Sequence, residues 1–181
     1  MSWQFDTSYV QKPEPVFTTV FENNLEFNNN LKQSILEHRN NNPESNNSNV
    51  NAWHSSYLTH KENPKFNHLI DIVLDACSII SKNQYQCPDV YFNVVNLWCM
   101  MYEKNDNTKI HNHFPSDFAC CYYVDVEPNC SPIIFENNFE IKPKNGMLII
   151  WPAVLDHEVP PTNGKRMCIS MNIDKKIYPY S

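Results

Sequence analysis

Glycine is almost missing from this chain of 181 residues, which contains only Gly146 and Gly164. Glycine-rich phosphate loops and dinucleotide-binding motifs need several glycines, because their backbone must approach the phosphates closely. The sequence therefore excludes both kinds of nucleotide site. Asparagine, which tolerates turn conformations better than most other residues, fills many of the turns instead.

Positive charge is also in short supply. The chain has 14 Lys and Arg against 20 Asp and Glu, so its net charge is -6 and we do not expect nucleic acid as a partner. Apolar runs such as residues 147–152 are too short to span a bilayer, so we expect no membrane partner. The N-terminal segment shows no basic start followed by an apolar stretch, which indicates a cytoplasmic location.

The seven cysteines form no CxxC pair of the kind that binds zinc. Their number is odd, and Cys120 and Cys121 are adjacent. In a chain without a recognisable secretory signal, this pattern indicates reduced and mostly buried thiols rather than a disulfide framework.

The hydrophobic pattern changes from helical to strand-like near Asp89. Before it, a short helix is expected within residues 25–38, a polar loop at residues 40–49, and a longer helix from Pro64 to about Ser81. After it come short β-branched and aromatic segments, at residues 90–102, 109–113, 117–126, 132–136, 139–142, 147–151, 157–159 and 166–173.

Many short strands without helices between them indicate an antiparallel sandwich or barrel. We therefore expect a mainly β protein with N-terminal helices packed on one face of the strands. Residues 1–181 are expected to form a single domain, in which residues 1–88 are a helical or irregular support and residues 89–181 are the β core.

Three of the seven histidines form a pattern that favours metal binding. His111 and His113 lie one residue apart on an expected strand, so period-two alternation would place both imidazoles on the same face. His157 begins a later strand that an antiparallel fold can bring beside them. Three imidazoles can occupy one face of an octahedral ion. We interpret His38, His54, His60 and His68 as surface or structural residues.

Arg166 lies on the strand that follows His157, among neighbours that are expected to be buried. A planar guanidinium at that place could bind a carboxylate through two parallel hydrogen bonds near the metal. The alternative for Arg166 is a solvated charge at a hairpin. The alternative for the HxH pair, taken alone, is two structural or exposed histidines.

Several segments, taken in order, resemble the double-stranded β-helix, or jelly-roll, core of the 2-oxoglutarate- and Fe(II)-dependent dioxygenase superfamily. They are HNHFP, the YY pair, KPKNGMLIIWP, the distal His157 and RMCISMN. The pattern is most similar to a branch of oxygenases common in bacteria and their phages, and it covers residues 98–173. If the chain is encoded by a phage, the cytoplasm would be that of the host.

The resemblance implies roles for individual residues. His111 would be the first iron ligand and His157 the distal one, while Arg166 and Tyr123 would bind the distal carboxylate of 2-oxoglutarate. Ser170 stands where relatives often carry a hydroxyl. His113 stands where the superfamily usually has aspartate, so the third ligand is either His113 or, four residues further on, Asp117.

The expected function is therefore that of an Fe(II)- and 2-oxoglutarate-dependent dioxygenase that hydroxylates a protein side chain or a small molecule. We expect an apolar lining from Phe118, Ile134, Ile149 and Trp151. One alternative is a cupin-like dioxygenase that does not use 2-oxoglutarate. Another is a jelly-roll binding protein without enzymatic activity, with zinc as a possible ligand. The sequence leaves the oligomeric state open.

Overall fold

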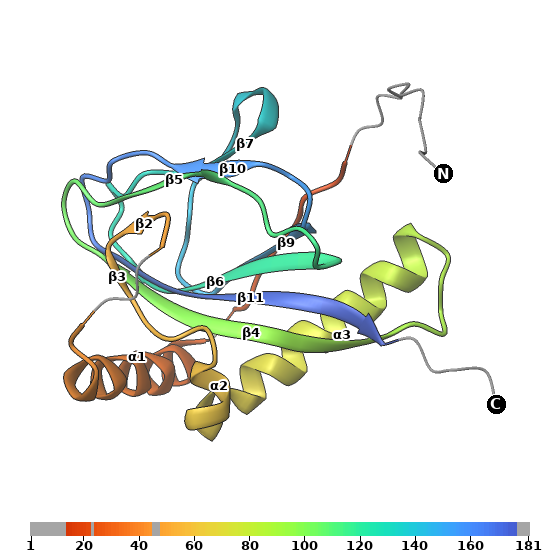
Figure 1. Cartoon of the computed structure of the whole chain (residues 1–181), viewed down its shortest axis with the longest axis horizontal. Helices are drawn as coiled ribbons and strands as arrows, with labels where there is room; N and C mark the ends of the chain where they lie inside the picture. The colour runs from red at the N-terminus through yellow and green to blue at the C-terminus, as the bar shows by residue number, and fades with distance from the viewer. Residues whose placement is uncertain (1–13, 23, 45–47, 177–181) are drawn as a thin grey trace, which may run out of the picture.

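The computed structural model describes residues 14–22, 24–44 and 48–176. Two antiparallel sheets face each other, and helices cover the outer side of the larger sheet (Figure 1). The helices are α1 (Leu25–Asn41), α2 (Thr59–Glu62) and α3 (Asn67–Gln84), the last preceded by a 3₁₀ turn that starts at Pro64. This architecture confirms the expected mainly β jelly roll with helices on one face.

The larger sheet has the strand order β1-β9-β6-β11-β4-β3 and the smaller one β2-β5-β10-β7-β8. In chain order the strands are β1 (Phe17–Val20), β2 (Val50–Asn51), β3 (Trp53–His54), β4 (Tyr91–Tyr102), β5 (Asn107–His111), β6 (Phe118–Val126), β7 (Ile133–Phe135), β8 (Phe139–Ile141), β9 (Met147–Pro152), β10 (His157–Val159) and β11 (Arg166–Lys176). Strands distant in sequence are thus neighbours, and β11 lies between β6 and β4.

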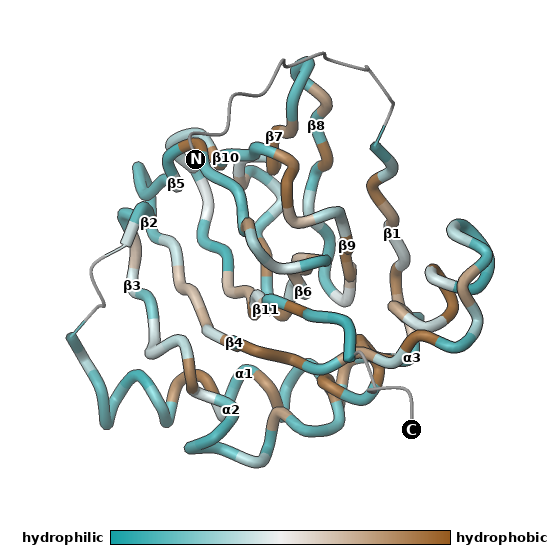
Figure 2. The backbone as a smooth tube through the Cα atoms, turned by 45° about the vertical axis from the view of Figure 1, so that its right-hand side comes forward, coloured by the Kyte–Doolittle hydropathy of each residue, from teal (hydrophilic) through white to brown (hydrophobic). Residues whose placement is uncertain are grey.

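Strand alternation divides the buried side chains into two layers. In β4, Leu97 and Cys99 face the helices, whereas Trp98 and Met100 face the smaller sheet. In Figure 2 the tube is accordingly apolar over stretches of the central strands, for example in β4 and β9.

Helices α1 and α3 are held to the larger sheet by apolar stripes. Leu31 of α1 and Leu69 and Val73 of α3 belong to the same buried cluster as Cys120 of β6. Each fully buried aliphatic side chain contributes roughly 1.5–3 kcal/mol relative to an exposed one. In addition, the Tyr122 hydroxyl donates a 2.6 Å hydrogen bond to Asn28 Oδ1 and links β6 directly to α1.

All eight expected strand segments correspond to strands, β4 to β11, but the sequence analysis missed β1, β2 and β3. The three are short, and β2 and β3 have only two residues each, too few for an alternating pattern. Helix α1 also extends to Asn41, into the stretch expected to be a loop. The expectation of a single domain stays a prediction.

The thiols agree with the expectation, since all seven cysteines are free and five of them are buried. Among the described residues, no helix is both long and apolar enough to cross a membrane.

Candidate active site

A cavity of about 440 Å³ lies between the two sheets. Strand β11 contributes alternate residues to its wall, because strand periodicity turns Arg166, Ser170, Asn172 and Asp174 inwards. The three histidines of the sequence pattern line the same cavity.

The smaller sheet brings the histidines together. His111 at the end of β5 lies directly opposite His157 at the start of β10. Their ring centroids are 4.3 Å apart, and that of His113 lies 5.0 Å from each of the other two. One nitrogen of each ring lies within 4.8 Å of the corresponding nitrogens of the others, so the three could bind one ion.

The sequence analysis placed His111 and His113 on one strand with alternating faces, and this explanation is only partly right. Strand β5 ends at His111, so His113 does not share a regular strand with it. Instead, the backbone amide of His113 donates a 2.7 Å hydrogen bond to Ala153 O, which ties this segment to the loop after β9. His113 thus reaches the cluster through a connection between the sheets rather than through simple alternation.

Hydrogen bonds and burial prepare two of the rings for metal binding. His111 Nδ1 lies 2.9 Å from Lys109 O, and His157 Nδ1 lies 3.2 Å from Leu155 O. A carbonyl can only accept, so each Nδ1 carries the proton and each Nε2 keeps a free lone pair. Burial, and to a lesser extent the neighbouring His111, lowers the pKa of His113 to about 3. Burial, together with His111 and His113, lowers the pKa of His157 to about 2.

The distances suit a divalent ion. His113 Nε2 and His157 Nε2 lie 3.3 Å apart. Two neighbouring ligands of an octahedral ion with bonds of roughly 2.1 Å are about 3.0 Å apart, which is close to this separation. Nitrogen ligands of this type bind iron, zinc or copper readily, so the residues present fit Fe(II).

Asp117 does not offer a carboxylate to this cluster. Its Oδ1 forms a 2.7 Å ion pair with Lys175 Nζ, and its Oδ2 accepts a 2.8 Å hydrogen bond from the Lys175 amide. The inward orientation expected for Asp117 is therefore wrong, because the segment between β5 and β6 is not a continuous strand.

Arg166 is only 3% exposed, and its guanidinium carbon lies 4.7 Å from the ring centroid of Tyr102 and 5.1 Å from that of Tyr123. Within the described part of the chain, no carboxylate lies within ion-pair distance of it, and its Nε has no hydrogen-bond partner. Burying a cation without a partner has a high free-energy cost, so we expect an anion to bind at Arg166.

The other residues expected to bind 2-oxoglutarate lie nearby. Ser170 is buried and lines the cavity. Tyr123 is fully buried beside Arg166, and its hydroxyl has no partner among the described residues. A carboxylate at Arg166 could accept from the Arg166 Nε and from the Tyr123 hydroxyl, so the residues fit such a group.

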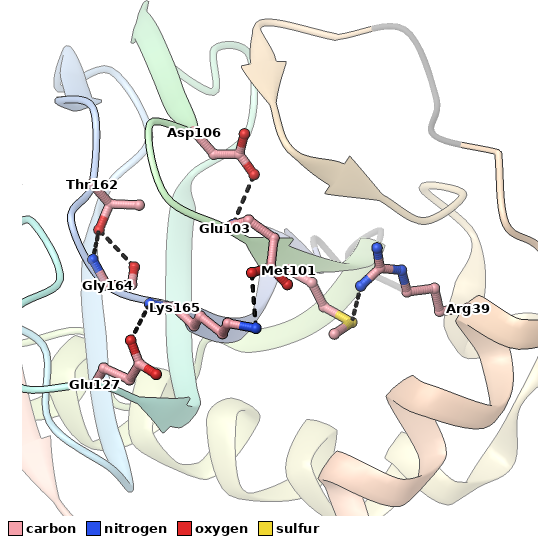
Figure 3. A network of polar contacts seen from close by, with 8 residues as sticks. All are labelled: Arg39, Met101, Glu103, Asp106, Glu127, Thr162, Gly164 and Lys165. Carbon is pink, nitrogen blue, oxygen red and sulfur yellow. Dashed lines mark hydrogen bonds and ion pairs between the residues drawn. The ribbon is translucent and has the colours of Figure 1, made fainter.

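A network of hydrogen bonds fixes the chain just before Arg166 (Figure 3). Thr162 is fully buried; its hydroxyl donates to Gly164 O at 2.8 Å and accepts from the Ser131 amide at 3.0 Å. Ser131 O in turn accepts a 3.4 Å hydrogen bond from Arg166 Nη1. Lys165 is held at both ends, by its amide to Glu127 and by its ammonium to Glu103.

The expected apolar lining is only partly right. Trp151 lines the cavity, but Phe118, Ile134 and Ile149 are not among its lining residues. Phe118 faces the helices and packs against Phe92, because the inward positions of β6 are the odd-numbered ones.

Sequence reasoning missed several residues of the wall. His54, interpreted as structural, lines the cavity and stacks on Trp98, which in turn stacks on His113. Tyr102, which contacts Arg166, was not singled out either. The one available signal was the alternation of β4, which turns Trp98 and Tyr102 to the same face as Met100.

The fold is similar to that of solved prolyl hydroxylases. A prolyl-4-hydroxylase from Pseudomonas putida is 10% identical, with a TM-score of 0.68 over 91% of this chain and 94% of that one. A prolyl hydroxylase from Trichoplax adhaerens, in complex with a hypoxia inducible factor peptide fragment, is 16% identical, with a TM-score of 0.67 over 87% and 83%.

A viral collagen prolyl hydroxylase from Paramecium Bursaria Chlorella virus-1, in a 2-oxoglutarate complex, is 15% identical, with a TM-score of 0.62 over 90% of this chain and 96% of that one. No curated protein matches the chain. Residues 135–172 match the family model described as "Putative 2OG-Fe(II) oxygenase". This match confirms the resemblance to 2-oxoglutarate- and Fe(II)-dependent oxygenases over this segment, and the solved structures share the fold.

Proposed function

We propose that this chain is an Fe(II)- and 2-oxoglutarate-dependent dioxygenase that hydroxylates a protein side chain or a small molecule. In this proposal His111, His113 and His157 hold the iron, and Arg166, Tyr123 and Ser170 bind 2-oxoglutarate. The main observation that supports this proposal is that three neutral imidazoles and a buried guanidinium without an anionic partner line one cavity. The cytoplasmic location stays a prediction.

The protein's part in such a reaction is to bind, orient and exclude water. When bound, Fe(II) and 2-oxoglutarate would supply the activation of molecular oxygen that hydroxylation requires. Arg166 would hold the remote carboxylate of 2-oxoglutarate, and the rings of Tyr102 and Tyr123, whose centroids lie 4.7 and 5.1 Å from the guanidinium carbon, limit its orientation. The indole rings of Trp98 and Trp151, which lie 5.7 and 5.9 Å from the His113 ring, limit the access of water.

A cupin-like dioxygenase that does not use 2-oxoglutarate would also suit three histidines. The buried, unpaired Arg166 favours the first proposal, because a reaction without a dicarboxylate gives this charge no partner. A binding protein without activity could hold zinc at the three histidines, but it gives the buried charge of Arg166 no defined partner.

The test is to load the purified protein with Fe(II) under nitrogen, add 2-oxoglutarate, admit oxygen and measure succinate. We expect succinate formation that depends on both cofactors and is lost in His157→Ala. Oxygen consumption without succinate would favour the cupin-like alternative, and no reaction with any metal would favour a binding protein.

A further inference from the structure

The cavity has one positive and one negative end. Apart from histidines, Arg166 and Asp174 are the charged side chains among its described lining residues. Both lie on β11 at inward-facing positions, eight residues apart and hence about 26 Å of strand. The proposed function uses Arg166 for 2-oxoglutarate, whereas it leaves Asp174 without a role.

The region around Asp174 offers hydrogen-bond acceptors that are not satisfied. Asn172 Nδ2 donates a 3.2 Å hydrogen bond to Asn96 Oδ1, which turns the Asn172 carboxamide oxygen away from Asn96. Apart from the approach of His113 to Asn172, this oxygen and Asp174 Oδ1 have no hydrogen-bond partner within the described residues, and both are inaccessible to solvent. Buried acceptors without donors are rare in native proteins, so a donor from a ligand is expected here.

Neighbouring cations do not neutralise Asp174. Lys175 is the next residue along β11, so alternation turns it to the opposite face, where its ammonium pairs with Asp117 at 2.7 Å. None of the ion pairs found in residues 14–22, 24–44 and 48–176 involves Asp174. The carboxylate is therefore available to an incoming cation.

We propose that Asp174, together with the carboxamide of Asn172, binds a cationic hydrogen-bond donor of the primary substrate, an ammonium or a guanidinium group. This inference rests on the proposed function and names its substrate class. A carboxylate beside an acceptor-only carbonyl selects a group with several donors and a positive charge. The net charge of -6 also favours the approach of cations.

The position of Asp174 also sets the distance between the cation and the oxidised carbon. Asn172 lies beside His113, and Asp174 follows two residues later, about 7 Å along the strand. Strand β4 lines this part of the cavity with Val95 and Asn96, and the aliphatic stems of lysine and arginine pack well on partly apolar walls.

The test compares probes that differ in the terminal cation. These are N-acetyl-lysine methylamide, its arginine counterpart and its norleucine counterpart, and short peptides with the same central residues. Affinity is measured by calorimetry on the metal-free protein and, under nitrogen, on the protein loaded with Fe(II) and 2-oxoglutarate. The succinate rate with each probe is divided by the basal rate of the same protein.

We expect the affinity and the relative succinate rate to be about tenfold higher, or more, for the lysine and arginine probes than for the norleucine probe. The reason is that a hydrogen bond to a charged group contributes a free energy of this size. Asp174→Asn should remove the preference, and Asp174→Glu, which keeps the charge, should retain it. Asp125→Asn is the matched control, since Asp125 pairs with Lys32 outside the cavity, and it should behave like the wild type. Stronger effects with peptides than with the methylamides would assign the cation to a protein substrate.

Equal binding of lysine and norleucine probes to the wild type would overturn the inference. So would a preference that survives in Asp174→Asn. Failure of the proposed function is a separate result, seen as the absence of any basal succinate formation by the wild type loaded with Fe(II).

Discussion

His113 Nε2 lies 3.3 Å from His157 Nε2, and burial keeps both rings neutral by lowering their pKa. The Nε2 of His157 has no proton to donate, because its Nδ1 donates to Leu155 O. A cation between the two nitrogens would be stabilised by both lone pairs, and the predictions for this site follow from that arrangement.

The first prediction concerns the unusual ligand. His113→Ala should weaken Fe(II) binding strongly, because one of three ligands is lost. His113→Asp should preserve or improve it, since two histidines and a carboxylate form the more common iron site. The measurement is an Fe(II) titration under nitrogen.

Asp117→Ala is the matched control, because Asp117 pairs with Lys175 and should affect iron binding little. If Asp117→Ala were the severe substitution and His113→Ala the mild one, the histidine assignment would be wrong. If neither changed iron uptake, the HxH motif would be structural.

Much of this site could be predicted from the sequence because its residues lie on strands with clear alternation. His111 ends β5, His157 begins β10 and Arg166 begins β11, and each of them lines the cavity. His113 follows the end of β5, where its position depends on a hydrogen bond to Ala153 that no local pattern reveals.

The remaining differences have a similar cause. Asp117 was expected to face inwards by counting along a strand that in fact ends at His111. His54 reaches the cavity from a strand of two residues, paired with Met100 of β4, and so short a strand has no periodicity to detect. Tertiary pairing, rather than local sequence, determines such positions.

The second prediction concerns the support of Arg166. Thr162→Val removes a buried hydroxyl that bonds to Gly164 and Ser131 and leaves their groups without partners. We expect the free energy of unfolding in urea to fall by about 1–3 kcal/mol and the KM for 2-oxoglutarate to rise. Ser131→Ala removes only an exposed hydroxyl hydrogen bond and should change both quantities much less.

The third prediction separates the helical support from the chemistry. Tyr122→Phe removes the hydroxyl that donates to Asn28 and leaves a buried acceptor unsatisfied. The free energy of unfolding in urea should fall by about 1–3 kcal/mol, whereas the KM for 2-oxoglutarate should stay the same. Tyr122 faces the helices, so a change in KM would mean that helix packing reaches the cavity.

The last prediction concerns the buried charge of Arg166. Replacing an unpaired buried cation by an apolar side chain of similar length is often neutral or stabilising, so Arg166→Met should not lower the thermal stability of the ligand-free protein. The wild type should gain stability from 2-oxoglutarate, about 2.7 kcal/mol at a concentration 100 times its Kd, and the variant should gain little. Thermal unfolding with and without 2-oxoglutarate, in the presence of Zn(II) instead of iron to prevent turnover, measures both effects. A variant that loses stability without ligand yet is stabilised by 2-oxoglutarate as strongly as the wild type would mean that Arg166 is structural. The anionic partner of this cation would then have to be sought outside the cofactor.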